Sequence, residues 1–378
     1  MPDEKLTAYR GGKALRRGWT TGSCAAAASQ AAAVLLLTGI APPEIHLHTP
    51  GGITFCLPVE DAHMSGNAAV CTVRKDAGDD PDITNGVRIT ASVRRIEKGV
   101  TIEGGAGVGR ITRPGLAMPV GEAAINPGPR QQIADAVHRA AQQNGYGGGF
   151  SVTISVKDGE ALAVQTYNGH LGIVGGISIL GTSGIVEPMS EKALVDTIRL
   201  ELDSLYAQGQ RIAFLCPGNY GADFARDTLG LDLERAVKCS NFIGEAFDHA
   251  AYRGYPEILL VGHAGKLVKM AAGVMNTHSS VADARQEIFT AHAALCGAPR
   301  ETLEGLMAAI SVDACVELLD EVNMRQPVLS RIGREMENRI ALRMKGQARV
   351  EFIMFTGKYG VLAESAGART LCERLKLQ

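Results

Sequence analysis

Residues 212–221 have the sequence IAFLCPGNYG, in which a run of five apolar residues ends in a polar loop with two glycines. The same pattern recurs at 258–266, where ILLV is followed by GHAGK. A short apolar run bounded by turn residues is typical of a strand that is buried on both faces. Helical stretches separate these runs, and alternation of strands with helices predicts a parallel, doubly wound sheet. We therefore expect an α/β, Rossmann-like domain over residues 171–378.

The other elements of this domain are predicted by the same rule. Further apolar strands are expected at 173–180, 236–239 and 350–356, and the last of them is expected to end the domain. Helices are predicted at 190–207, 222–228, 242–253, 281–296, 301–309, 312–323 and 330–344.

Residues 1–170 show a different pattern, which predicts an α+β domain with a mainly antiparallel sheet. An alanine-rich helix is expected at 22–38, ended by Gly39. It is not a lipidated segment, because a lipidated cysteine should follow the apolar run and Cys24 precedes it. The run is also too short to span a bilayer, so we expect a buried helix. A second helix is expected at 128–143. Strands are predicted at 44–48, 53–59, 68–74, 87–96 and 99–103, with a hairpin of 151–156 and 162–166 around Asp158-Gly159.

Composition bounds the function. The chain has 378 residues and a formal net charge of −2, so no global charge favours nucleic acid or a membrane as partner. The 8 cysteines form no C-x-x-C pair, which favours a reducing, cytoplasmic setting and no protein-bound metal. His46 and His48 are interpreted as surface histidines. A homo-oligomer is left open.

Polar, glycine-containing loops follow the predicted strands of the second domain, and ligands bind at the carboxyl ends of strands in an open parallel sheet. Tyr220 could stack on a flat ring, and Glu187 could accept hydrogen bonds from ribose hydroxyls. None of the loops has the G-x-G-x-x-G or P-loop pattern. The candidate cofactor-binding residues are Gly181, Thr182, Ser183, Gly184, Glu187, Gly218, Asn219, Tyr220, Glu245 and Gly262.

The first domain has clusters of charge. Residues 76–82 contain four aspartates in seven positions, which suits either a cation and polar substrate groups or a solvated turn. Arg16 and Arg17 belong to a basic start of the chain that is either solvated or faces carboxylates. Arg130, beside Glu122 and Asn126, could pair with a carboxylate through two hydrogen bonds.

Several of these segments resemble the cobalt-precorrin-5B C1-methyltransferases, the CbiD family. They are residues 18–25 (GWTTGSCA), 79–84 (DDPDIT), 121–127 (GEAAINP), 172–189, 217–221, 241–245, 260–269 and 276–285. Trp19, Gly128, Ser183 and Ala264 depart from the family pattern without changing a charge. The last 90 residues carry no signature that we recognise.

The resemblance implies methyl transfer from S-adenosylmethionine to C1 of a cobalt-bearing tetrapyrrole, in the anaerobic route to cobalamin (vitamin B12). Cobalt would arrive inside the substrate. His263 and His278 are candidate bases, although each could equally hold a loop by hydrogen bonds. Because the substrate carries acetate and propionate groups, cationic and polar side chains are expected to bind it: Arg16, Arg17, Thr20, Thr21, Ser23, Asp80, Asp82, Glu122, Asn126, Arg130 and Lys266.

Three other functions are compatible with the residues. The strongest alternative is a nicotinamide-dependent reductase that acts on a tetrapyrrole intermediate. A small-molecule kinase and a tetrapyrrole carrier are the others. If the loops bind the methyl donor, Gly181→Val is expected to weaken donor binding and to leave the fold intact.

Overall fold

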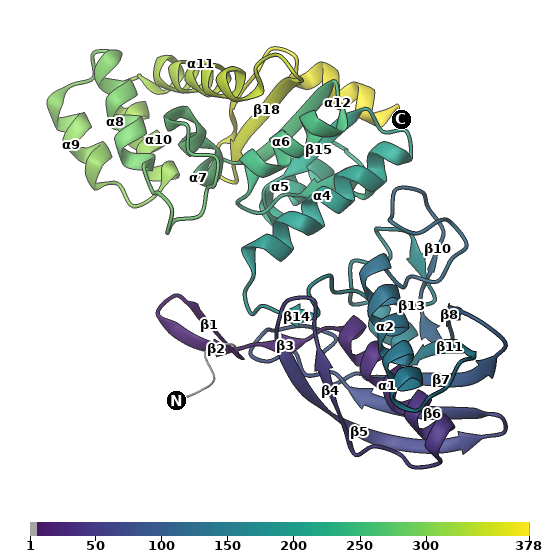
Figure 1. Ribbon diagram of the computed structural model, residues 1–378. Coiled ribbons are helices and arrows are strands. Elements are labelled where there is room, and N and C mark those ends of the chain that lie inside the picture. The colour runs from purple at the N-terminus through teal and green to yellow at the C-terminus, as the bar shows by residue number, and fades with distance from the viewer. Residues whose placement is uncertain (1–5, 378) are drawn as a thin grey trace. The chain divides into compact units, whose positions relative to one another are not determined.

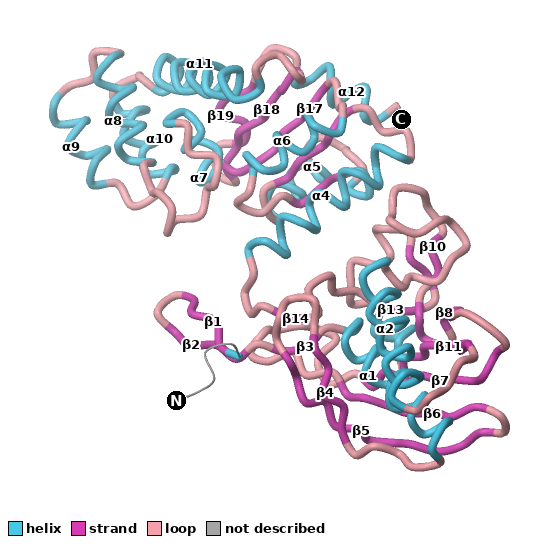
Figure 2. The backbone as a smooth tube through the Cα atoms, viewed as in Figure 1, coloured by secondary structure: helices cyan, strands magenta, loops and turns pink. Residues whose placement is uncertain are grey.

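The computed structural model describes residues 6–377 and shows two compact units, Met1–Glu191 and Lys192–Gln378. Figures 1 and 2 show that strands mostly follow one another in the first unit, whereas helices separate most of the strands in the second unit. We describe each unit by itself and call them the first and the second unit.

The first unit is built on a six-stranded sheet in the order β4-β5-β6-β7-β11-β8. All neighbouring strands are antiparallel except β11 and β8, which are parallel. The predicted α+β unit with a mainly antiparallel sheet is therefore confirmed. The strands are β4 (Glu44–His48), β5 (Thr54–Ser65), β6 (Ala68–Arg74), β7 (Arg88–Ile96), β8 (Val100–Gly104) and β11 (Gly149–Val156).

Two helices, α1 (Thr21–Thr38) and α2 (Pro127–Gln143), pack against each other, and α1 packs on the sheet. Alanines from Ala25 to Ala33 are fully buried, because a methyl side chain lets the helix approach the strands closely. Among the described residues, α1 alone is long and apolar enough to cross a membrane, but 78% of that window is buried inside the unit. It is a core helix, as predicted.

Small strands complete the first unit. They are β1 (Thr7–Arg10), β2 (Lys13–Arg16), β3 (Gly18–Trp19), β9 (Gly107–Val108), β10 (Arg110–Ile111), β12 (Ile173–Val174), β13 (Gly176–Ile177) and β14 (Ile185–Val186).

The predicted hairpin of 151–156 and 162–166 is wrong. β11 pairs with β7 on one side and β8 on the other, so it offers no free edge to a following strand. The chain instead turns at Asp158 into a short helix, α3 (Gly159–Ala163).

The segment 173–180 is not a strand of the second unit. β12 pairs with β10, β13 with β9, and β14 with β3, so residues up to 191 belong to the first unit. The units therefore divide between Glu191 and Lys192, whereas the boundary expected from sequence lies at 170.

The second unit contains a five-stranded sheet in the order β16-β15-β17-β18-β19. Its first four strands are parallel and β19 is antiparallel. The predicted strand at 350–356 is confirmed, but β19 and a helix follow it. The strands are β15 (Ile212–Cys216), β16 (Ala236–Lys238), β17 (Glu257–His263), β18 (Arg349–Thr356) and β19 (Gly360–Glu364).

Alternate residues along these strands enter two separate cores. Leu215 and Leu260 pack with residues of α4 (Glu191–Ala207), α6 (Ile243–Arg253) and α11 (Arg325–Met344). Phe214 and Leu259 pack with residues of α5 (Asn219–Asp227) and α12 (Ala368–Lys376). Helices thus cover both faces of a mainly parallel sheet, which is an α/β arrangement.

Further helices lie between β15 and β18 in the sequence. They are η2 (Leu233–Arg235), α7 (Ala264–Leu267), η3 (Val268–Ala272), α8 (Arg285–Leu295), α9 (Arg300–Ala308) and α10 (Val312–Glu321).

Candidate active site

The aspartate-rich loop of the first unit is held by bonds within the unit. Both terminal nitrogens of Arg16 donate to the carboxylate of Asp76, at 2.7 and 2.8 Å. The hydrogen bond from Arg16 lowers the pKa of Asp76. The backbone N–H of Arg16 donates to Asp79 (2.6 Å), and that of Met189 donates to Asp80 (2.9 Å). The loop therefore joins three segments of the chain.

A buried lysine binds the C-terminal end of this loop, at Asp82 and Thr84. Lys75 is only 2% exposed, and its ammonium pairs with the Asp82 carboxylate and donates to the Thr84 hydroxyl (2.7 Å). Burial alone would raise the pKa of Asp82, but the Lys75 charge and the hydrogen bonds lower it further than burial raises it. Lys75 thus supplies a positive charge beside Asp82, where a hard cation was one of the predicted partners.

The start of α1 is tied to the loop at 180–184. Thr20 caps the helix by accepting a hydrogen bond from the Ser23 N–H (3.2 Å). The Gly184 carbonyl accepts hydrogen bonds from the Thr20 N–H (3.2 Å) and the Ser23 hydroxyl (2.7 Å). The Leu180 N–H donates to the Thr21 hydroxyl at 2.9 Å. Predicted substrate residues and predicted cofactor residues therefore contact each other within the first unit.

The start of α2 lies in the same neighbourhood. A Cβ on Gly22 would lie 2.8 Å from a ring carbon of Pro129, so the starts of α1 and α2 are in contact.

The predicted substrate residues near the start of α2 have partners within the first unit. Arg130 donates to the carbonyls of Ile125 (3.0 Å) and Ile102 (2.9 Å), and it lies 3.5 Å from the Glu122 carboxylate. Asn126 is the N-cap residue but makes no side-chain capping bond. Arg17 pairs with Glu187 at 2.8 Å.

The loop Gly181–Gly184 and Glu187 were grouped with the second unit because a parallel strand was expected to precede them. That reason is wrong, since the preceding strands pair within the first unit. The Gly181 carbonyl accepts a hydrogen bond from Gln132 of α2 (2.9 Å), while Thr182 and Ser183 are exposed.

The predicted loops at 217–221, 241–245 and 262–266 do come together, at the carboxyl ends of β15, β16 and β17 in the second unit. The Lys266 ammonium donates to the Ser240 carbonyl (3.3 Å), and that of Lys238 donates to the Asn219 side chain (3.3 Å). The rings of Tyr220 and His263 lie 6.0 Å apart. The three loops therefore lie side by side where β15, β16 and β17 end, as expected for parallel strands. We call this row of strand ends and loops the second-unit edge.

Helix α5 begins close to this edge because residue 221 is a glycine. A Cβ on Gly221 would lie 2.7 Å from the Val261 carbonyl oxygen of β17. Tyr220, one residue earlier, is 78% exposed. Glu245, in the first turn of α6, pairs with Arg199 at 2.9 Å.

The two candidate bases both hold loops. His263 caps α7, its Nδ1 accepting a hydrogen bond from the Gly265 N–H (3.1 Å), and burial lowers its pKa. His278 is exposed, and its Nδ1 lies 2.6 Å from the Ser280 hydroxyl. Because the Nδ1 of His263 accepts a hydrogen bond and the pKa of this imidazole is lowered, Nδ1 carries no proton near neutral pH. A role for either residue in proton transfer stays a prediction.

The family model described as CbiD matches residues 8–188, and that of the CbiD C-terminal domain matches residues 276–366. A relative from Ruminiclostridium cellulolyticum, named cobalt-precorrin-5B C(1)-methyltransferase, is 50% identical over 92% of this chain and 90% of its own. The chain belongs to the CbiD family. The second match also covers most of the C-terminal 90 residues, where no signature was recognised from sequence.

Other CbiD proteins are similar over comparable lengths. The relative of the same name from Alkaliphilus metalliredigens is 43% identical over 97% of this chain and 96% of its own. That from Salmonella typhimurium is 46% identical over 82% and 81%. The crystal structure of cobalamin biosynthesis protein (cbiD) from Archaeoglobus fulgidus is 30% identical, has a TM-score of 0.41, and covers 75% of this chain and 88% of its own.

This CbiD-family chain has a titratable group beside the second-unit edge that sequence reasoning missed. Glu201 of α4 is 9% exposed, and burial raises its pKa to about 7, against the lowering effects of the charge and backbone hydrogen bond of Lys238. Lys266 has a lowered pKa, chiefly because of burial. Glu201 lies among charged residues in the pattern of a surface helix, so its burial had no sequence signal.

Glu201→Gln is expected to stabilise the second unit above neutral pH. In the folded protein the pKa of Glu201 is about 7, which lies above its unfolded value. Protonated Glu201 therefore contributes stability below the unfolded pKa, and this contribution is lost as pH rises through about 7. We expect a gain of about 1–3 kcal/mol at pH 8 and little change at pH 4, measured by urea unfolding followed by far-UV circular dichroism. Asp203→Asn, two residues away and more exposed, is the control. An equal gain at both pH values would contradict this pH dependence.

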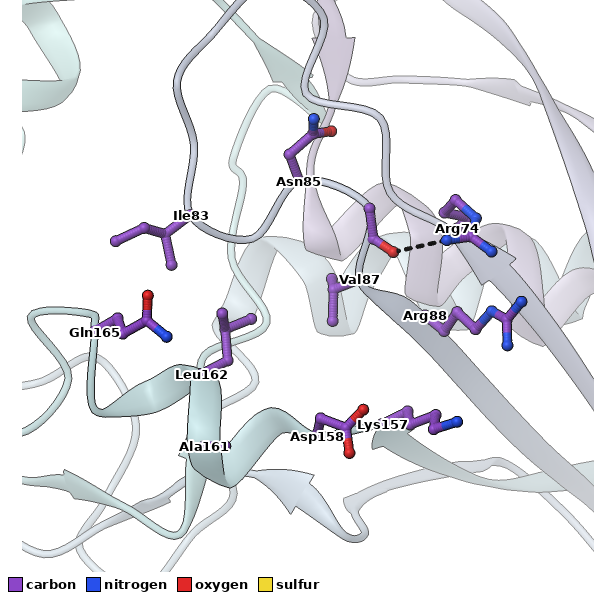
Figure 3. A pocket seen from close by; sticks show the side chains of 11 residues that line it. Arg74, Ile83, Asn85, Val87, Arg88, Lys157, Asp158, Ala161, Leu162 and Gln165 are labelled. Atoms are coloured by element: carbon purple, nitrogen blue, oxygen red, sulfur yellow. Dashed lines mark hydrogen bonds between the residues drawn. The ribbon is translucent and has the colours of Figure 1, made fainter.

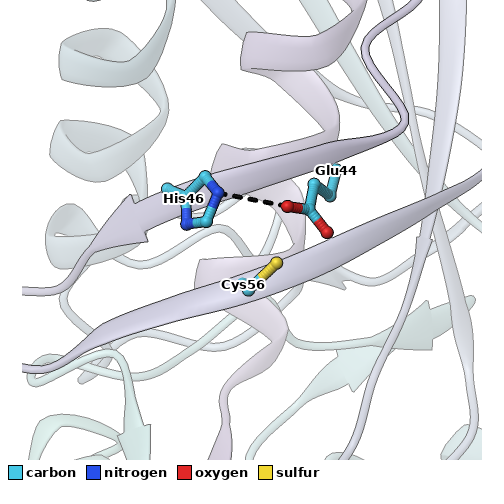
Figure 4. A group of neighbouring side chains, drawn as sticks. All are labelled: Glu44, His46 and Cys56. Carbon is cyan, nitrogen blue, oxygen red and sulfur yellow. Dashed lines mark ion pairs between the residues drawn. The ribbon is translucent and has the colours of Figure 1, made fainter.

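One group of side chains in the described part of the CbiD-family chain could hold a metal ion. Glu44 and His46 of β4 and Cys56 of β5 place one ligand atom each within 4.8 Å of one another (Figure 4). His46 and Cys56 face each other across the strand pair. All three are exposed, and a hydrogen bond with Glu44 raises the pKa of the Cys56 thiol. Cys56 was not associated with His46 from sequence because cross-strand register is not visible there.

Proposed function

We propose that this chain is a cobalt-precorrin-5B C(1)-methyltransferase. It would transfer a methyl group from S-adenosylmethionine to C1 of cobalt-precorrin-5B and yield cobalt-precorrin-6A, in the cytoplasm. The observation that carries the proposal is 50% identity, over 92% of the chain, with a relative of that name.

The reaction needs alignment more than an acid or a base. C1 of the macrocycle attacks the methyl carbon, the carbon–sulfur bond breaks, and its electron pair stays on sulfur as S-adenosylhomocysteine. Holding carbon, methyl and sulfur in line, with water excluded, can contribute about 7–11 kcal/mol in favourable cases. A site built of shaped loops suits this chemistry, because the methyl group of the sulfonium is already activated.

We propose that the second unit is Rossmann-like and that its strand edge binds the donor. The exposed ring of Tyr220 supports this, because it offers an aromatic face to the adenine. Asn219 and Glu245 lie at the starts of α5 and α6, where they could bind ribose hydroxyls. Gly218 leaves the backbone before α5 partly accessible, whereas Gly262 is buried against Leu267 and Pro217. Glu245 would have to share its carboxylate with Arg199.

Arginines of the first unit are the proposed partners of substrate carboxylates. Arg16 and Arg130 already make bonds within the unit, so they would bind as a fixed scaffold instead of as free side chains. Lys266 of the second unit, which donates only to the Ser240 carbonyl among the described residues, keeps donors for an anion.

The test is anaerobic incubation of the protein with cobalt-precorrin-5B and S-adenosylmethionine carrying a ¹³C-labelled methyl group. We expect one label per macrocycle, located at C1 by NMR, and one S-adenosylhomocysteine released for each label. NADPH in place of the donor is the control. Consumption of NADPH without methyl incorporation would favour the reductase, and binding without any turnover would favour a carrier.

A further inference from the structure

The first unit has a pocket of about 440 Å³ that none of the predicted site residues lines. It lies between the loop that follows β6, the start of β7 and the turn from β11 into α3 (Figure 3). Arg74, Arg88 and Lys157 supply positive charge, and Ile83, Val87 and Leu162 supply apolar surface. We call it the basic pocket. Its volume is within the range of small-molecule sites.

Two of its arginines share one carboxylate. Glu60 accepts hydrogen bonds from Arg74 and, at 3.0 Å, from Arg88. The hydrogen bond from Arg74 lowers the pKa of Glu60, so that this carboxyl is ionised and offsets only one of the two charges. Within residues 6–377, the terminal nitrogens of Arg88 have no hydrogen-bond partner. They are free to donate to a ligand.

The third cation has an acid beside it. Lys157 and Asp158 are both exposed, and neither side chain has an ion-pair partner among the residues that the structure describes. The Lys157 N–H donates to the Arg88 carbonyl (3.3 Å), which fixes the turn against the start of β7. With Glu60 and Asp158 included, the pocket has three positive and two negative charges, a net charge of +1.

The opposite wall is preorganised and apolar. Ile83 is 48% exposed although its loop is held by the Lys75–Asp82 pair and by a hydrogen bond from the Ala77 N–H to Asn85 (2.9 Å). A rigid loop that presents an isoleucine to solvent beside arginines fits a ligand with an apolar body and acidic edges.

We propose that the basic pocket binds acetate or propionate side chains at one edge of the tetrapyrrole substrate. This inference rests on the proposed function. Arg88 and Lys157 pair with the carboxylates, Ile83 and Leu162 contact the adjacent apolar surface, and Asp158 opposes the bound anion.

Because Lys157 and Asp158 carry opposite charges, neutralising one or the other should change the affinity for an anion in opposite directions. The probe is cobyrinic acid, a cobalt corrin with free acetate and propionate groups, titrated at low salt and followed by its absorption. Lys157→Gln is expected to weaken binding by about three- to tenfold, and Asp158→Asn to strengthen it by about two- to fivefold. Asparagine tolerates the positive φ of residue 158. Lys98→Gln, in the turn after β7, is the matched control and should change nothing.

Two further measurements make the sign test specific. The heptamethyl ester of cobyrinic acid, which lacks the charges, should bind equally to all three variants and the wild type. The affinity for S-adenosylmethionine should be the same in Lys157→Gln as in the wild type, while the KM for cobalt-precorrin-5B rises. Fluorescence of Trp19 confirms that each variant is folded.

The outcomes separate this proposal from the proposed function. If the wild type methylates C1 but both charge variants keep its KM and its affinity for the probe, the pocket assignment is wrong and the function stands. If the variants shift probe binding in opposite directions but no methyl transfer occurs, the pocket binds polycarboxylates and the function is wrong. Shifts in the same direction, or a tighter Lys157→Gln, overturn the pocket assignment.

Discussion

Replacing Lys75 by methionine is expected to lower the free energy of unfolding of the first unit by about 3 kcal/mol. Methionine keeps much of the length of the side chain but removes the charge, so the Asp82 carboxylate and the Thr84 hydroxyl lose a donor in a site where Lys75 is 2% exposed. Trp19 reports on this region. It is the only tryptophan of the chain, and its indole N–H donates to the Arg74 carbonyl (3.1 Å). Urea unfolding followed by its fluorescence measures the loss.

A double-mutant cycle shows whether the pair itself is responsible. Asp82→Asn in the Lys75→Met background should cost less than it does in the wild type, because the unpaired charge is removed. Since the pKa of Asp82 is lowered in the folded state, its stabilising contribution is present above the unfolded pKa and is lost as pH falls through the folded value. The difference between wild type and Lys75→Met should therefore narrow below about pH 4. Additive effects that are independent of pH would argue against the pair.

Elements with strong local signals were predicted well. The alanine-rich helix was expected at 22–38 and spans Thr21–Thr38, because a capping threonine precedes it and Gly39 follows in the left-handed conformation. The strands 44–48, 68–74 and 212–216 have the predicted bounds. In each of them, turn residues limit the strand at both ends.

Elements whose partner decides their structure were not predicted. The apolar residues of 173–180 satisfy the pattern of a buried strand, but nothing local says which sheet receives them, and they pair with β9 and β10. Similarly, Asp158-Gly159 is a hairpin turn signal that predicts a strand at 162–166, yet both edges of β11 are occupied. Tertiary pairing overrides local preference in both cases.

The candidate site shows the same division. The glycine-containing loops after β15, β16 and β17 could be predicted to meet, since parallel strands end at one edge. The partners of the charged residues could not, because Arg16 and Asp76 are 60 positions apart and Lys75 is next to an aspartate, as a surface lysine would be. Charges that seemed available for substrate are therefore paired in the structure. The basic pocket was missed because its cations come from three separate strands or turns.

Gly181→Val is expected to destabilise the first unit by at least about 3 kcal/mol, contrary to the intact fold expected from sequence. Gly181 has a φ of +122°, and a Cβ there would lie 2.3 Å from Oγ1 and 2.4 Å from Cβ of Thr20. Thr20 caps α1, so the clash would displace the start of the core helix. Urea unfolding followed by Trp19 fluorescence measures the effect, and calorimetric titration with S-adenosylmethionine measures donor binding.

Gly175→Val separates strain from collision. Gly175 also has a positive φ (+81°), but a Cβ there meets no atom within 4 Å, so this variant should lose only about 1–2 kcal/mol. Replacing Thr20 by glycine should recover part of the loss in the Gly181→Val background, although it removes a cap in the wild type. If Gly181→Val instead keeps wild-type stability and loses donor binding, the loop at 181–184 contacts the donor. Donor binding would then be assigned to the first unit, because the contact between Gly181 and Thr20 lies within that unit.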